Sequence, residues 1–125
     1  MKLQPDKSNA PTIQAHGPGW IEVNGQTHKQ SVVVSSLENL PSFAWGPSNF
    51  AQLAAQDFEK LALDGVELVI LGCGQRLQFP RASDLQALMA KGIGLESMDT
   101  AAACRTYNIL ASEGRKVLAA LIIET

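Results

Sequence analysis

The segment Gly72-Cys73-Gly74 stands directly after an apolar run and is the first place where the sequence could hold chemistry. A thiol becomes a nucleophile when a cationic neighbour lowers its pKa, and Arg76 is close enough in sequence to do so. However, the sequence positions no base beside Cys73, so we name no catalytic residue. A small buried hydrophobe is the simpler role for this cysteine.

The same glycines resemble part of a dinucleotide-binding turn, and we reject that interpretation. Such a turn needs a helix that begins immediately after the glycines, so that backbone N–H groups meet the phosphate. Here a loop containing Pro80 separates Gly74 from the next expected helix at Ser83, and the third glycine of the motif is missing. The glycines therefore predict a sharp exit from a sheet, and we expect no cofactor.

A second candidate site follows from position in the fold. Ligands bind beyond the carboxyl ends of parallel strands, and three segments follow expected strands here: Gly72–Gly74, Met98–Thr100 and Glu124–Thr125. With a helix cap at Asp99 or Thr100, Arg76 and Arg81 could form an anion pocket; alternatively, both arginines are solvated surface charges. The predicted ligand-binding residues are Gly72, Cys73, Gly74, Arg76, Arg81, Asp99 and Thr100.

Two aromatic residues, Phe43 and Trp45, lie in a segment bordered by Pro41 and Pro47. Aromatic side chains on a loop can anchor a protein partner, because tryptophan is common at the energetic centres of interfaces. They can equally fold over the edge of a core. Phe43 and Trp45 are therefore the predicted partner-binding residues, provided that they are exposed.

Composition excludes several classes of function. Ten basic and twelve acidic residues leave a net charge of -2, and no basic cluster exceeds the pair Arg115-Lys116, so we expect no nucleic-acid binding. Two cysteines and two histidines, widely spaced, fit neither a disulfide framework nor a metal site. The chain shows no signal-peptide core and no apolar run of about 20 residues, so we expect no membrane insertion and a cytoplasmic location.

With 125 residues, the chain is long enough for a single domain, residues 1–125, in which residues 1–11 form a loose arm. Its clearest local signal is Asn24-Gly25, which favours a type I′ turn and fixes the register of a hairpin. Val23 would then face Gln26, and Ile21 would face His28. A strand at 13–16 would precede the hairpin, whose second strand would continue through 31–34.

From residue 48 onward, helical and strand patterns alternate. Ser83 and Gln86 are typical of a capping box, and Glu113 and Arg115 would form a surface ion pair. The expected elements are a helix over 48–64, a strand over 66–71, a helix over 83–91, a strand over 93–97, a helix over 100–113 and a strand over 116–123. Alternation of this kind predicts parallel strands joined by crossovers. The fold class is therefore α/β: a layered β/β/α-type domain with an N-terminal antiparallel hairpin and a short parallel βαβαβ core.

The most distinctive block of sequence lies in the last third of the chain. It comprises Gly92-Ile93-Gly94-Leu95-Glu96, Met98, Thr100, Ala103, Thr106-Tyr107-Asn108, Leu110 and Glu113-Gly114-Arg115. Together with the turns at Asn24-Gly25 and Gly72-Cys73-Gly74, this block resembles the Mth-type domain family of small conserved proteins of unknown function. That family includes mitochondrial complex I assembly factor three and the adipogenesis-associated protein of animals. The resemblance covers roughly residues 12–123 and implies a β/β/α-layered domain without established catalytic residues.

Three hypotheses about function remain. The first is a non-enzymatic binding or assembly-assisting module that uses Phe43 and Trp45. The second is a small-molecule or anion-binding protein, or an enzyme, that uses the crevice at Gly72–Gly74 and Met98–Thr100. The third is a homo-oligomer whose interface is the hairpin face. The second predicts a Cys73 that solvent can reach and arginines that point inward, and the first predicts an exposed Trp45.

Overall fold

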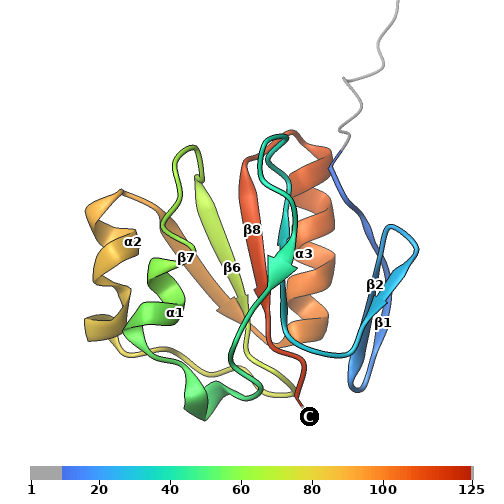
Figure 1. Cartoon of the computed structure of the whole chain (residues 1–125), viewed down its shortest axis with the longest axis horizontal. Helices are drawn as coiled ribbons and strands as arrows, with labels where there is room; N and C mark the ends of the chain where they lie inside the picture. The colour runs from blue at the N-terminus through green and yellow to red at the C-terminus, as the bar shows by residue number, and fades with distance from the viewer. Residues whose placement is uncertain (1–9, 125) are drawn as a thin grey trace, which may run out of the picture.

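The computed structural model describes residues 10–124, which form a mixed α/β domain with two sheets (Figure 1). The smaller sheet is antiparallel and consists of β1 (Ile13–Gly17), β2 (Trp20–Val23) and β3 (Gln26–His28). The larger sheet has the strand order β5-β4-β8-β6-β7, with β4 at Val32–Ser35, β5 at Phe43–Ala44, β6 at Leu68–Gly72, β7 at Gly94–Met98 and β8 at Val117–Leu121. Most of the predicted loose arm, residues 1–11, lies outside the described residues.

The hairpin between β2 and β3 is confirmed in its turn and in its register. Asn24 and Gly25 have φ angles of 49° and 82°, as a type I′ turn requires. Val23 pairs with Gln26, and Ile21 pairs with His28. The predicted continuation of the second strand through residue 34 is wrong, because β4 leaves the small sheet and pairs with β8. The chain therefore passes from the small sheet to the large sheet in the short segment between His28 and Val32.

The parallel core is also confirmed. β6 pairs in parallel with β7 on one side and with β8 on the other. The crossover between β6 and β7 contains the short helices η2 (Ala82–Leu85) and α2 (Gln86–Ala90), and the crossover between β7 and β8 is α3 (Thr100–Ser112). All three parallel strands therefore end at the same edge of the sheet, where the candidate site was predicted.

Both faces of the large sheet are covered, since neighbouring residues of its central strands point into different cores. On one face, Ile70 and Ala119 pack with α3 and the small sheet. On the opposite face, Leu71 and Ala120 pack with the helices α1 (Ala55–Glu59) and α2. Figure 1 shows these layers, with α1 and α2 at the left and α3 at the right. A sheet buried on both sides explains why these strands are nearly continuous runs of apolar residues.

The predicted helix over 48–64 is wrong, because the chain forms two short helices there. The 3-10 helix η1 (Phe50–Gln52) ends at Leu53, and α1 begins after Ala54, which is extended with φ −140° and ψ 167°. The Asp57 carboxylate accepts a hydrogen bond from the Ala54 N–H at 2.9 Å, so this N–H is unavailable to a continuous helix. The apolar side chains of the segment are buried nonetheless, which is why the helical pattern was present.

The helix predicted over 83–91 is a 3-10 turn followed by α2, without the expected capping box. Arg81 occupies the cap of η2, and no side chain caps either helix. Gly92, with φ +68°, ends the segment as predicted. α3 is the longest described helix, at 13 residues. Within residues 10–124, no helix combines the length and the apolar character needed to cross a membrane.

Asn108 on α3 attaches the small sheet to the rest of the domain. Its Oδ1 accepts a hydrogen bond from the Ile13 N–H at 2.9 Å, and its Nδ2 donates to the Ile13 carbonyl at 2.8 Å. The neighbouring Tyr107 is fully buried, and its hydroxyl donates to the Pro11 carbonyl at 2.8 Å. Two adjacent residues of the distinctive block thus hold β1 against α3.

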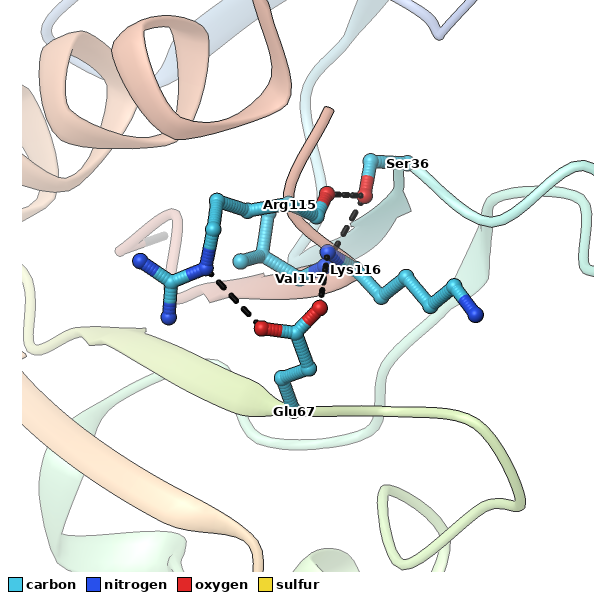
Figure 2. A network of polar contacts seen from close by, with 5 residues as sticks. All are labelled: Ser36, Glu67, Arg115, Lys116 and Val117. Atoms are coloured by element: carbon cyan, nitrogen blue, oxygen red, sulfur yellow. Dashed lines mark hydrogen bonds and ion pairs between the residues drawn. The ribbon is translucent and has the colours of Figure 1, made fainter. Parts of the chain in front are cut away.

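A polar network joins the opposite, amino-terminal ends of β6 and β8, and Figure 2 shows it from close by. Arg115 Nε donates to Glu67 Oε1 at 2.9 Å, so the predicted pairing of Arg115 with Glu113 is wrong. The second Glu67 oxygen accepts from the Lys116 N–H at 3.2 Å. Ser36 donates to the Arg115 carbonyl at 2.7 Å, which links β4 to the same corner.

Replacing Glu67 with glutamine is expected to remove one acid-sensitive contribution to stability. The hydrogen bond from Arg115, followed by that from Lys116, lowers the pKa of Glu67 from its ordinary value of 4.5. Because the pKa is lower in the folded chain, the contribution is present above pH 4.5 and is lost as pH falls through the folded pKa. Melting temperatures measured from about pH 7 to about pH 3 should therefore differ between wild type and Glu67→Gln at neutral pH and converge in acid. Glu113→Gln is the control, and a difference that stays constant with pH would contradict the expectation.

Candidate functional site

Thr100 joins three segments at the carboxyl-terminal edge of the parallel strands. Its Oγ1 accepts a hydrogen bond from the Gly74 N–H and donates one to the Ile122 carbonyl, each at 2.8 Å. Its own N–H donates to the Gly74 carbonyl at 2.9 Å. One side chain therefore fixes the exit of β6, the end of β8 and the start of α3 relative to one another.

Two carboxylates lie at this edge. Asp99, one of the two predicted caps, is the N-cap of α3, and its Oδ1 accepts from the Ala102 N–H at 2.8 Å. Glu124 Oε1 accepts from the Gln75 N–H at 3.0 Å. A Cβ atom on Gly74 would lie 2.6 Å from the Glu124 side chain, and Gly74 has φ +99°, so both the conformation and the close approach require glycine.

The turn between β1 and β2 forms the facing wall. In Figure 1 this turn, the start of α3 and the end of the chain lie together at the lower end of the molecule. The Trp20 indole lies against Gly17, where a Cβ atom would come within 2.6 Å of its Nε1. The position of this wall depends on Asn108, which attaches β1 to α3.

Between these walls is a pocket of about 400 Å³. This volume lies in the range of small-ligand sites. Its ionisable side chains are His16, Asp99 and Glu124, and its apolar surface comes from Pro18, Trp20 and Ala101, because the isoleucines that border it are almost fully buried. No lysine or arginine lines it among the described residues. The pocket thus presents two carboxylates beside an aromatic ring. Within residues 10–124, no three histidine, cysteine, aspartate or glutamate side chains gather as metal ligands would.

The predicted crevice residues separate into those that the pocket contains and those that it does not. Gly74, Asp99 and Thr100 line the pocket. Gly72 is buried, and a Cβ there would lie 3.1 Å from the Thr100 backbone, so this glycine permits close packing. Arg76 is exposed outside the pocket, and Arg81, with a 77% exposed side chain, pairs with Asp84. The expectation that either arginine points inward is wrong, because neither lines the pocket and Arg81 is drawn to Asp84 on the surface.

The thiols are also placed away from the pocket. Cys73 is fully buried, and its Sγ donates to the Gln78 carbonyl at 3.1 Å, so the expectation that solvent reaches it is wrong. Burial raises the pKa of Cys73. Burial likewise raises the pKa of Cys104 to about 12. A nucleophile needs a lowered pKa, so the structure gives neither thiol the activation that a catalytic cysteine has.

The loop after Gly74 presents apolar side chains to solvent. Leu77 is 50% exposed and Phe79 is 73% exposed. The loop backbone is nevertheless held at three points, by the bonds of Gly74 to Thr100, of Gln75 to Glu124 and of Gln78 to Cys73. Exposed apolar residues on a loop anchored in this way are candidates for partner contact.

The predicted partner anchors are placed differently from the expectation. Trp45 is 4% exposed, its Nε1 donates to the Asp57 carbonyl at 3.2 Å, and its ring meets Phe58 edge-on at 6.3 Å. Phe43 is half-buried in the edge strand β5. Of the two alternatives for Trp45, an exposed partner anchor or a residue folded over the edge of a core, the structure shows the second, because Trp45 packs on the core formed by α1 and the large sheet.

Sequence reasoning missed His16 and Trp20 as pocket residues, and it missed the exposed pair Leu77 and Phe79. The carboxyl-end rule did find Glu124. Nothing local to the hairpin indicates that its β1 side approaches the end of β8, since that contact is made over about a hundred residues of sequence. The signal for Leu77 and Phe79 was available, because two apolar residues stand in a loop that ends at Pro80.

A family model and individual relatives agree on the family to which this chain is similar. Residues 13–122 match a family described as "Protein of unknown function (DUF498/DUF598)". An uncharacterised protein of Rhodobacter capsulatus is 35% identical over 95% of this chain and 90% of its own length. The human and zebrafish proteins named NADH dehydrogenase [ubiquinone] 1 alpha subcomplex assembly factor 3 are 44% and 30% identical over 96% of this chain. The chain spans 65% of the human and 68% of the zebrafish protein.

Solved structures agree with this fold. A crystal structure of a Bordetella parapertussis protein is 34% identical, with a TM-score of 0.84 over 92% of this chain and 97% of that one. A solution structure from Bordetella pertussis, described as a Mth938-like domain, is 31% identical with a TM-score of 0.82 over 99% of this chain and 93% of that one. The predicted fold class and the predicted family resemblance are therefore confirmed.

Proposed function

Because this chain belongs to the DUF498/DUF598 family of proteins of unknown function, we propose that it is a non-catalytic protein-binding module that helps a respiratory-chain complex to assemble. The complex would be the cell's NADH dehydrogenase, and the chain would bind one of its subunits or an intermediate of its assembly. The binding surface would be the loop carrying Leu77 and Phe79, together with the adjacent pocket rim.

The names of the relatives support the choice of complex. Proteins that are 44% and 30% identical over 96% of this chain are named as assembly factors of NADH dehydrogenase in human and zebrafish. This chain corresponds to about two thirds of their length. The shared domain is therefore a candidate for the part of those proteins that contacts a client.

The single observation that carries the surface is the exposure of Leu77 and Phe79 on a loop that hydrogen bonds hold at three points. Phe79 is 73% exposed although its loop is hydrogen-bonded to α3, to Glu124 and to Cys73. Because these bonds already hold the loop backbone at three points, less backbone entropy is lost when a partner covers Phe79. The gain from burying its apolar surface is then retained as affinity.

The cytoplasm is the compartment we propose. Both cysteines, Cys73 and Cys104, are free and buried, which suits a reducing compartment, where disulfides are rare. The client would meet the chain at the cytoplasmic face of the membrane in which NADH dehydrogenase is built.

The double variant Leu77→Asp/Phe79→Asp should reduce assembly of NADH dehydrogenase in the source cell. Each substitution replaces an apolar anchor by a charge, and losing an interface anchor lowers affinity by roughly tenfold or more. The chromosomal copy would be replaced by the variant, and the assembled complex would be measured on native gels together with NADH oxidation in membranes. The melting temperature of the purified variant should match wild type, because both side chains are exposed.

Met89→Asp/Ile109→Asp is the matched control, since these apolar side chains are 66% and 58% exposed but lie on α2 and α3. The control should leave assembly unchanged. Normal assembly in the Leu77/Phe79 variant would overturn the proposal. The proposal would also be overturned if the source cell made no NADH dehydrogenase of this kind. Equal losses in both variants would show that this loop is not the binding surface.

A further inference from the structure

We propose that the pocket between the β1–β2 turn and the start of α3 receives an arginine side chain of the protein partner. This inference rests on the proposed function and deepens it, because it names the chemistry of the partner at one point of contact. It is carried by the combination of a cavity of about 400 Å³, two carboxylates and an indole ring in the lining.

The charge of the pocket selects a cation. Asp99 and Glu124 contribute two carboxylates, and His16 is the only other ionisable side chain among the described residues that line it. Arg76, Arg81 and Arg105, the nearest cations along the chain, do not line it, and Arg81 pairs with Asp84. No described cation of this chain therefore neutralises the two carboxylates, and a cationic group from outside would.

The backbone donors at this edge disfavour the opposite choice, an anion. A helix start such as that of α3 attracts anions through its free N–H groups, but here the chain's own acceptors occupy the N–H groups of Thr100, Ala102 and Ala103. The Ala102 N–H donates to Asp99, the Gln75 N–H donates to Glu124, and the Gly74 N–H donates to Thr100. Each carboxylate uses one oxygen in these bonds, so its second oxygen is left to accept from a ligand.

The indole of Trp20 favours arginine over lysine. It forms part of the pocket wall and is held in place against Gly17. A guanidinium group is planar, stacks on aromatic rings and offers several N–H donors to carboxylates at once, whereas an ammonium group is a compact, strongly hydrated charge. The apolar surface of Pro18 and Ala101, which also line the pocket, suits the methylene stem of the same side chain.

The pocket and the exposed loop form one continuous surface. Gln75 lines the pocket, and Leu77 follows two residues later, so their Cα atoms are at most about 7 Å apart. A partner segment with an arginine next to apolar residues would therefore place its charge in the pocket and its apolar side chains on Leu77 and Phe79.

The test is a two-dimensional NMR titration of the full ¹⁵N-labelled chain with N-acetyl-L-arginine N-methylamide. The neutral isostere N-acetyl-L-citrulline N-methylamide is the matched probe. The arginine probe should shift the Trp20 indole N–H and the backbone amides of Gly74, Gln75 and Ala101, and the citrulline probe should bind about tenfold more weakly or worse. Salt at about 1 M should weaken the arginine response.

The double variant Asp99→Asn/Glu124→Gln keeps an oxygen acceptor for Ala102 and Gln75 while removing both charges, so it should fold and bind the arginine probe at least about tenfold more weakly. Equal shifts with both probes, shifts located elsewhere, or tighter binding of inorganic phosphate would overturn the inference. If free L-arginine bound more than about tenfold more tightly than the capped probe, the pocket would be a site for a free metabolite, and the inference of a partner's arginine would be overturned.

These outcomes are separable from those for the proposed function. Failure of the arginine probe, with assembly still dependent on Leu77 and Phe79, removes only the inference about the pocket. Normal assembly in the Leu77/Phe79 variant removes the proposed function, whatever the titration shows.

Discussion

Replacing Asn108 with alanine is expected to destabilise the chain by about 2–3 kcal/mol and to loosen the small sheet. Asn108 makes two hydrogen bonds to Ile13, one to its N–H at 2.9 Å and one to its carbonyl at 2.8 Å. Alanine leaves both backbone groups without these partners, and each lost bond to a partly buried group costs about 1–1.5 kcal/mol. Urea unfolding followed by circular dichroism measures the loss.

The loss of stability in Asn108→Ala should be larger in the small sheet than in the rest of the domain. Amide hydrogen exchange in β1 should accelerate by roughly 30- to 100-fold in Asn108→Ala. Exchange in β6 and β8 should change less, because the large sheet keeps its own pairings. Ile109→Ala is the matched control, since Ile109 is the next residue of α3 and is 58% exposed. If the control is destabilised as much as Asn108→Ala, Asn108 is not the attachment point that the geometry indicates.

Replacing Thr100 with valine is expected to cost about 2–3 kcal/mol, although the two side chains have nearly the same shape. The hydroxyl accepts from the Gly74 N–H and donates to the Ile122 carbonyl, and valine satisfies neither group. Because Thr100 joins the ends of β6 and β8 to α3, the pocket should open as well. The Trp20 indole and Gly74 amide resonances would then move in the NMR spectrum.

Thr100→Ser is the control for this second expectation. Serine keeps the hydroxyl and loses only a methyl group, so most of the stability and the native chemical shifts should return. The geometry would be contradicted if valine were as stable as threonine, or if serine were as destabilising as valine.

The parts of the fold that sequence predicted were those set by local rules. Asn24-Gly25 permits one tight turn, and that turn fixes the register of β2 against β3. Asp99 and Gly114 bound α3, because one caps its first turn and the other has φ +83° just after its end. The parallel orientation of β6 and β8, though not the order of the strands in the sheet, followed from alternation of helix and strand.

The parts that sequence did not predict depend on contacts between distant residues or on competition for one N–H group. The helix over 48–64 is broken because the Asp57 carboxylate takes the Ala54 N–H. Trp45 is buried because α1 supplies both an acceptor and the Phe58 ring for it. A loop of this composition is equally compatible with an exposed tryptophan, so only the tertiary structure decides.

The residues of the candidate site also fall into a group that sequence predicted and a group that depends on distant contacts. Asp99, Thr100 and Glu124 were found because strands in parallel end at one edge. The wall formed by His16 and Trp20 was not found, since it depends on the bonds between Asn108 and Ile13, 95 residues apart in the chain. Arg76 and Arg81 were assigned to the site from proximity in sequence alone, and neither of them lines the pocket.

The most direct test of the central claim, that the loop after β6 contacts a subunit of NADH dehydrogenase, is photo-cross-linking in living cells. Benzoylphenylalanine would be introduced in place of Phe79, or in place of Ile109 as the matched exposed position on α3. We predict a cross-link from position 79 to a subunit of that complex, identified by mass spectrometry, and none from position 109. Cross-links from position 79 only to a second copy of this chain, or equal products from both positions, would contradict the account.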